Sequence, residues 1–347
     1  MLFRSAGDGA TNGSLNLAAS NNMNATATAD GSAASGAGGT SVGIAVAINV
    51  AAMTDSAVIG SNAIIKADGV TRSAGMRDVG GDLKHDFAAK ATSGASGGDT
   101  GVAGSFALNV SDTTAEAAVK AGSSLTITDG GGDVAMSAAN TSDSTVEAKA
   151  KSGGANLGVG ISIAINAVDN ITNAELKPTA TLSGAEDVTL SATGSHKTST
   201  TSTSGGAAKD GTGVGGAFAI TVADNTSSAT VGSGTLLDIT GSLSATATHH
   251  GDSATTADGT ALGADAAIGA AIALAFVDDS AIATTSRNIT ADKSVTFGAH
   301  GDGSSIVSAK ASSEGADKTK EAAKGNTKAD DQKTKQTNLA NAKSGKS

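Results

Sequence analysis

The chain has 347 residues, a formal net charge of −10, 47 Gly, one Pro, no Cys, Trp or Tyr, and 2% aromatic residues. This composition excludes disulfides and thiolate metal sites, and it lacks the basic stripe and stacking aromatic rings with which proteins bind nucleic acid. The longest apolar run, Ala266–Val277, is too short for a membrane-spanning helix. The apolar residues are mostly Ala, Val and Ile, which fill a thin core better than a thick one.

Residues 1–5 match no pattern in the rest of the chain, and we assign them to a non-repeat leader. The codons CTC TTC CGA TCT of a sequencing adapter encode Leu2–Ser5, so our hypothesis is an artefactual scar on a fragmentary gene from environmental sequencing. The next stretch, Gly13–Gly39, matches only the second half of the units that follow it.

Residues 6–312 are expected to form a β-strand repeat region of about five units, each 54–60 residues long. One nine-residue segment marks each unit, at 42–50, 102–110, 159–167, 214–222 and 268–276. In the first copy, Val42 and Ile44 share one face while Gly43 and Ala45 share the other. Such alternation is typical of a strand. Because the second face is small rather than charged, we expect another layer to pack closely there and the strand to be buried on both sides.

A second, shorter strand is expected in each unit, for example at Val134–Met136 and Val188–Leu190, with an irregular copy near Leu83. Glycine pairs precede the main segment and suit tight corners, where φ is positive. These pairs are Gly38-Gly39, Gly97-Gly98, Gly153-Gly154 and Gly205-Gly206.

No single unit could bury its own apolar face, whereas stacked units could. We therefore predict an all-β, repetitive β-solenoid of the parallel β-helix type. The alternative is a row of small β-sandwich repeats, which the lack of Pro-rich or charged linkers disfavours. The last segment, 313–347, is Lys-rich and is expected to be a non-strand insertion or linker that is truncated.

The repeat unit also resembles a known family. The pattern Val-Gly-x-Ala-x-Ala-x-Asn-x-x-Asp-Asn-x-Thr, followed by Gly-Asp-Val-x-x-Ser-Ala, is similar to repeats of giant bacterial surface adhesins, the leukotoxin-like and filamentous-haemagglutinin-like proteins. The best matches are Val159–Thr172 with Asp187–Ala192, and Val214–Thr226; Ala52 and Ala275 depart from the pattern. The resemblance implies an extracellular or bacterial cell-surface location, in an outer-membrane-associated parent protein of autotransporter-like type.

A recurring acid is the strongest candidate for a binding site. It lies three residues past the Asn position of four units, at Asp112, Asp169, Asp224 and Asp278. In a solenoid these carboxylates would stack in a column, and Ca²⁺ could relieve their repulsion. The alternative interpretation is that each Asp stabilises a turn through side-chain hydrogen bonds.

The Asn position itself, at Asn49, Asn109 and Asn166, predicts an inward amide ladder hydrogen-bonded between coils. The five histidines lie at no fixed repeat position, and we expect them in solvated loops. They are His85, His196, His249, His250 and His300.

From these observations we expect a structural stalk segment of a large secreted or surface adhesin, with no catalysis and no cofactor. Four Arg and the absence of Trp and Tyr are a poor inventory for a solenoid polysaccharide enzyme. The alternative function is a calcium- or carbohydrate-binding solenoid module. The expected partners are neighbouring repeats of the parent chain and glycans or proteins of host or neighbouring-cell surfaces, with no nucleic acid and no membrane span.

Overall fold

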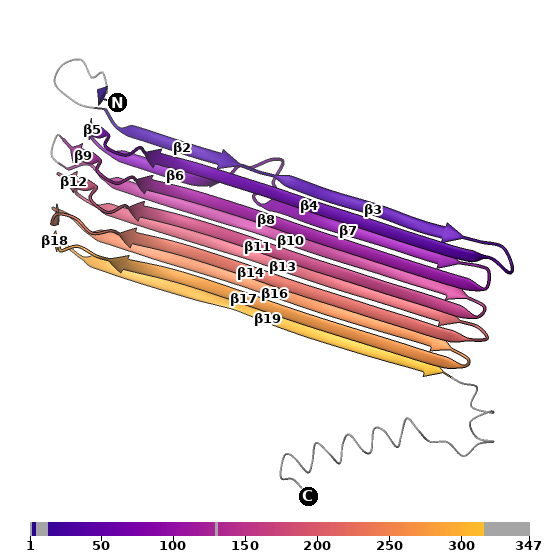
Figure 1. The fold of residues 1–347 in the computed structure, drawn as a ribbon. Helices are drawn as coiled ribbons and strands as arrows, with labels where there is room; N and C mark the ends of the chain where they lie inside the picture. The colour runs from indigo at the N-terminus through magenta and orange to yellow at the C-terminus, as the bar shows by residue number, and fades with distance from the viewer. Residues whose placement is uncertain (1, 5–12, 129–130, 316–347) are drawn as a thin grey trace, which may run out of the picture.

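The computed structural model describes residues 2–4, 13–128 and 131–315, and all regular elements within these ranges are strands. They form a flat solenoid in which two long sheets lie face to face (Figure 1). The predicted all-β repetitive solenoid is therefore confirmed. Most of the Lys-rich segment predicted over 313–347 lies outside the described residues, and the last strand continues to Gly315.

Each repeat makes one coil. In the middle of the chain, the short strand β9 (Ser124–Ile127) leads into the long strand β10 (Val134–Gly154). After a turn of two residues, the chain returns as the long strand β11 (Leu157–Leu176), and the short strand β12 (Thr181–Ser183) begins the next coil.

The long strands form two parallel sheets. Sheet I contains the return strands β4 (Thr40–Ile59), β8 (Thr100–Val119), β11, β14 (Thr212–Val231) and β17 (Ala266–Thr285). Sheet II contains β2 (Leu15–Asn21), β3 (Asn24–Ala34), β6 (Val70–Met76), β7 (His85–Ser96), β10, β13 (Val188–Ala208), β16 (Leu243–Gly263) and β19 (Val295–Gly315).

The short strands line one narrow side of the solenoid. They are β1 (Leu2–Arg4), β5 (Ile64–Ala67), β9 and β12 in one ladder, and β15 (Leu237–Ile239) with β18 (Ile289–Ala291) in another. Leu2–Arg4, assigned from the sequence to a non-repeat leader, pairs in parallel with Ile64–Lys66.

The five marker segments lie side by side in residue-for-residue register. Val159 is paired with Val102 on one side and with Val214 on the other. The same row continues to Val42 in β4 and to Ile268 in β17. The sequence spacing between marker segments is therefore the length of one coil.

The orientation of these strands differs from the expectation that both faces are buried. The small residues Gly43, Ala45 and Ala47 point inward, whereas Val42 and Ile44 point outward and are 53% and 66% exposed. The large apolar face of sheet I is thus the outer surface of the solenoid.

The close approach of the two sheets explains this orientation. A Cβ atom at Gly158 would collide with the backbone oxygen of Ala207, and one at Gly215 would collide with that of Thr260. Near the two-residue turns, therefore, only Gly, Ala and Ser fit between the sheets. At the opposite end, where the short strands hold the sheets apart, the core includes larger side chains such as Met136, Leu176 and Leu190.

Sheet II also differs from the sequence interpretation. The expected short strand at Val134–Met136 is the beginning of a 21-residue strand that includes the Ser/Thr/Ala stretch behind it. In the second coil the matching residue is Val70, which pairs with Val134, and not the exposed Leu83.

The glycine pairs serve two different purposes. Gly38, Gly97 and Gly98 have φ values of 70–78°, as expected for tight corners. Gly205 and Gly206, in contrast, lie within β13, where Gly206 makes room for the backbone of Val214. Among the described residues, no helix has the length and hydropathy required to cross a bilayer.

Candidate functional site

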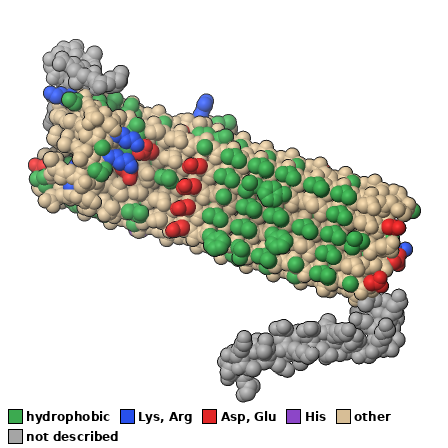
Figure 2. Space-filling view, in the orientation of Figure 1, with side chains coloured by type: hydrophobic (Ala, Val, Ile, Leu, Met, Phe, Trp, Pro, Cys, Tyr) green, Lys and Arg blue, Asp and Glu red, His purple; other side chains and the backbone are tan. Residues whose placement is uncertain are grey.

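The predicted carboxylate column lies on the outer face of sheet I. Asp169 is paired with Asp112 on one side and with Asp224 on the other, and Asp224 is paired with Asp278. All four side chains are exposed, and acidic side chains form a column beside an apolar area in Figure 2. In the first coil Ala52 occupies this position.

The column is electrostatically unfavourable. Partial burial raises the pKa of Asp169, and the neighbouring carboxylates Asp112 and Asp224 raise it further. Within the described ranges, none of the ion pairs involves these three residues, and no three His, Asp or Glu side chains converge in a way that could hold a metal ion. Cation binding along the column stays a prediction.

These Asp residues do not stabilise turns. Asp112 lies in the middle of β8 and Asp169 in the middle of β11, so the turn interpretation was wrong. The sequence signal was ambiguous because Asp-Asn and Asp-Thr pairs are common in turns.

The Asn residues at the repeat position lie inside the solenoid. Asn49 Nδ2 donates to Oδ1 of Asn109 at 2.7 Å, and Asn109 Nδ2 donates to Oδ1 of Asn166 at 3.0 Å. Ser144 of sheet II donates to the same Oδ1 of Asn166 at 2.7 Å. The ladder therefore links successive coils and also ties the two sheets together. Because Asn109 and Asn166 are fully buried, this ladder is not accessible to a ligand.

A second polar ladder, which the sequence analysis missed, runs four residues further along the strands. Thr113 Oγ1 donates to Oδ1 of Asn170 at 2.5 Å, Asn170 Nδ2 donates to Oδ1 of Asn225 at 2.6 Å, and Asn225 Nδ2 donates to Oδ1 of Asp279 at 2.7 Å. The signal was the Asn that follows Asp169 and Asp224 in the repeat. It belongs to the inward face, because adjacent residues of a strand point to opposite sides.

Three of the five histidines are buried in strands, contrary to the expectation of solvated loops. His85, His196 and His249 are 1–2% exposed. His85 and His196 both pair with Ser142, so they occupy the same register position in coils on either side of it. Variation in coil length concealed this relation in the sequence.

The interior environment sets the protonation state of His196. Burial, and to a smaller extent the nearby rings of His249 and His85, lower the pKa of His196 to about 3. Its Nδ1 lies 2.8 Å from Ser142 Oγ, whereas its Nε2 has no hydrogen-bond partner. His196 is therefore neutral at physiological pH.

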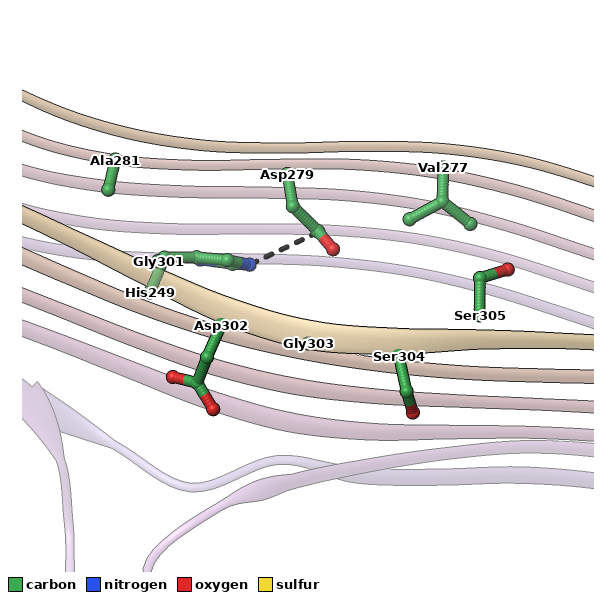
Figure 3. A pocket seen from close by; sticks show the side chains of 9 residues that line it. All are labelled: His249, Val277, Asp279, Ala281, Gly301, Asp302, Gly303, Ser304 and Ser305. Atoms are coloured by element: carbon green, nitrogen blue, oxygen red, sulfur yellow. Dashed lines mark hydrogen bonds and ion pairs between the residues drawn. The ribbon is translucent and has the colours of Figure 1, made fainter.

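The second ladder ends at a hollow of about 400 Å³ between β17 and β19. His249, Asp279 and Ser305 lie along it, and Figure 3 shows His249 Nε2 directed at Asp279, 3.1 Å from its Oδ1. Ser227 Oγ lies 3.4 Å from His249 Nδ1, which gives the residue types of a hydrolytic triad. Ser227 is fully buried, however, so a substrate carbonyl has no path to its hydroxyl.

This hollow lies at the last described coil, where the inner faces of β17 and β19 are partly exposed. Asp279 in this hollow is the last member of the second polar ladder, which links the preceding coils. Among the described residues, no further strand pairs with β17 or β19 on this side of the hollow. Comparisons with models of known families, with curated proteins and with solved structures found no match to this chain.

Proposed function

We propose that this chain is a structural stalk segment of a large secreted or cell-surface bacterial adhesin and performs no catalysis. The observation that carries this proposal is the uninterrupted register of all five return strands. Each coil offers its successor the same strand edge in the same register, so such a structure can be extended by further coils.

The geometry refines how such a stalk would work. Adjacent strands are about 4.8 Å apart, so each coil adds about that length, whereas a 20-residue strand is about 66 Å long. Each repeat therefore uses more than 50 residues to add about 4.8 Å of length. The long strands instead make the stalk wide in cross-section, and a wide rod resists bending better than a narrow one.

The buried amide ladders support the same role. They place hydrogen bonds between coils in an interior from which water is excluded, where such bonds specify one register. Asn109, for instance, is bonded to the coils before and after it. In this proposal the partners of each coil are its neighbouring repeats, and receptor binding belongs to other parts of the parent protein.

Deletion of one coil tests the proposal. Removing residues 157–211 joins Asn156 to Thr212, the residue that pairs with Leu157, and should let β8 pair directly with β14. We expect a folded, cooperatively melting protein whose stacking dimension, measured by small-angle scattering, is shorter by about 4.8 Å.

The matched control removes 157–187, which deletes β11 and β12 but leaves β10 next to β13. This half-coil deletion should aggregate or unfold. If the full-coil deletion fails in the same way, the coils are not interchangeable and the stalk proposal is wrong.

The second candidate function is calcium or carbohydrate binding along the carboxylate column. The raised pKa of Asp169 beside Asp112 and Asp224 favours it, because a cation would relieve their repulsion. Calcium that raises the melting temperature of the protein, but not that of a variant with Asp169→Asn and Asp224→Asn, would support this function. Equal melting with and without calcium would exclude calcium binding along the column.

A further inference from the structure

The two outer faces of the solenoid differ in chemistry. Outward positions of β13 in sheet II are mostly Ser, Thr and Lys, for example the exposed Thr193 and Lys197, with Gly205 and Ala207 near the turn. Outward positions of sheet I form five apolar rows across five strands, and Figure 2 shows apolar side chains gathered over this face. We call this surface the apolar face.

The rows of the apolar face run across the coils in register. They begin at Val42, Ile44, Val46, Ile48 and Val50 in β4, all more than 50% exposed. In β17 they end at Ile268, Ala270, Ile272, Leu274 and Phe276.

The size of the apolar face matches that of a stable protein interface. Five strands about 4.8 Å apart and five rows about 6.7 Å apart cover roughly 800 Å². This is about the area that each partner contributes to a standard interface, and it exceeds the apolar patches that monomers usually expose.

The carboxylate column limits how an occupant can lie on the apolar face, because it borders one side of it. A negatively charged lipid surface would be repelled by Asp112, Asp169, Asp224 and Asp278, and the chain has no Trp or Tyr to anchor in a bilayer interface. A second copy keeps the two columns apart only if they lie at opposite sides of the contact, each near the exposed Asp99, Asp210 and Asp265 at the turn end of the other copy. That condition requires strands that run in opposite directions in the two copies.

The surface shape of the apolar face also favours two copies with antiparallel strands. Phe106 lies two residues from Gly104, so a large side chain stands beside a gap on β8. The corresponding Gly216 of β14 is not a gap, because atoms of Ile161 and Phe218 lie within 4 Å of its Cβ position. No atom lies within 4 Å of a Cβ placed on Gly104. A two-fold axis parallel to the stacking direction, between the rows of Gly104 and Phe106, sets Phe106 of each copy opposite Gly104 of the other.

The geometry points to a homodimer in which the apolar faces of two copies pack together with antiparallel strands. The two-fold axis runs along the stacking direction, so each coil faces the same coil of its partner. The contact buries the apolar rows, fits Phe106 over Gly104 of the other copy, and keeps the two carboxylate columns apart. A stalk built this way would be a double slab with two polar outer faces.

Sedimentation velocity of the full chain over a dilution series tests this inference. We expect a reversible monomer–dimer equilibrium that Ile161→Lys shifts to monomer, with the dissociation constant raised at least about a hundredfold because a charge would be buried at the contact. The matched control Thr193→Lys adds the same charge to an exposed position of the polar face and should leave the equilibrium unchanged.

Gly104→Val provides an independent variant that fills the gap on the apolar face. It should leave the melting temperature of the monomer unchanged or slightly raised, because the site is open, and weaken the dimer at least about tenfold. It also preserves the test should Ile161→Lys fail to fold.

Three outcomes would overturn the inference. The chain could be monomeric at every concentration. A dimer could persist equally in Ile161→Lys and Thr193→Lys, which would place the contact at the strand edges. The monomer could bind phosphatidylcholine vesicles through Ile161, which would make lipid the occupant of this face.

Discussion

At the scale of single residues, the interior of this solenoid contains buried ionisable side chains. One of them, His196, is kept neutral, and another, Arg72, has no hydrogen-bond partner. His196 is held neutral, since the folded state lowers its pKa to about 3. The unfolded chain binds a proton at this His near pH 6.5. Between these two values the unfolded state carries more protons, so the free energy of unfolding falls as the pH falls.

We predict that the protein loses stability below pH 6.5, by up to about 1.4 kcal/mol per pH unit from His196. The shift of His85 has the same direction and adds to the effect. Urea unfolding at a series of pH values measures the slope. His196→Gln should flatten it, and an unchanged slope in that variant would contradict the assignment.

Arg72 is a second buried ionisable residue. It is fully buried, its Nε and both terminal nitrogens lack hydrogen-bond partners, and burial lowers its pKa to about 10. It occupies the row of Leu17, Met136 and Leu190, which are apolar. A guanidinium in this row is a net cost to folding.

Arg72→Met should therefore raise the free energy of unfolding by about 2 kcal/mol, because it removes a buried polar group that has no hydrogen-bond partner. The new side chain is the one that the next coil has at the same position, Met136. Chemical denaturation compares the two proteins. The reciprocal change Met136→Arg serves as the control and should destabilise. A loss of stability in Arg72→Met would mean that the guanidinium has a favourable partner.

At the scale of the elements, the sequence identified the strands of sheet I and their register. It did not give the length of the strands of sheet II or which face of sheet I lies inside. Alternation at Val42–Val50 shows that two faces exist, and both are apolar, so hydropathy alone cannot assign one to the core. The deciding fact is the distance between the sheets, which depends on the two-residue turn and on the opposite strand. Gly43, Gly160 and Gly215 were the available signal, since glycine in a strand marks close backbone approach.

The candidate sites could also be predicted only in part from the sequence. The Asn49, Asn109 and Asn166 row could be predicted because it recurs at one position of a repeat. The buried histidines could not, because coils of unequal length hide the shared position of His85 and His196. Pairing across strands, rather than position in the repeat, determines their environment.

The close packing of the sheets gives a direct prediction. Gly158→Ala should destabilise the protein by about 3 kcal/mol, because its Cβ would collide with the backbone of Ala207, which cannot move without disrupting the strand. The matched control is Gly104→Ala on the open outer face, where the methyl group has space and should stabilise by up to about 1 kcal/mol. Similar effects of the two changes on thermal melting would contradict the packing.

At the scale of the whole molecule, each repeat forms one coil that pairs in register with the next. The outer surface of sheet I is apolar, and that of sheet II is polar. The polar surface of sheet II is suited to solvent, and the apolar face of sheet I is suited to a partner. Both the stalk proposal and the dimer inference depend on the same fact, that each repeat places its return strand directly beside that of the next repeat.

Cysteine cross-linking tests this register most directly, since the chain has no native Cys. Ile161 and Gly216 are paired across β11 and β14, so the double variant Ile161→Cys, Gly216→Cys should form an intramolecular disulfide under mild oxidation. The mismatched pair Ile161→Cys, Ile220→Cys, four residues out of register, should stay reduced within the monomer. Cross-linking of the mismatched pair, or equal cross-linking of both, would contradict a solenoid with one coil per repeat.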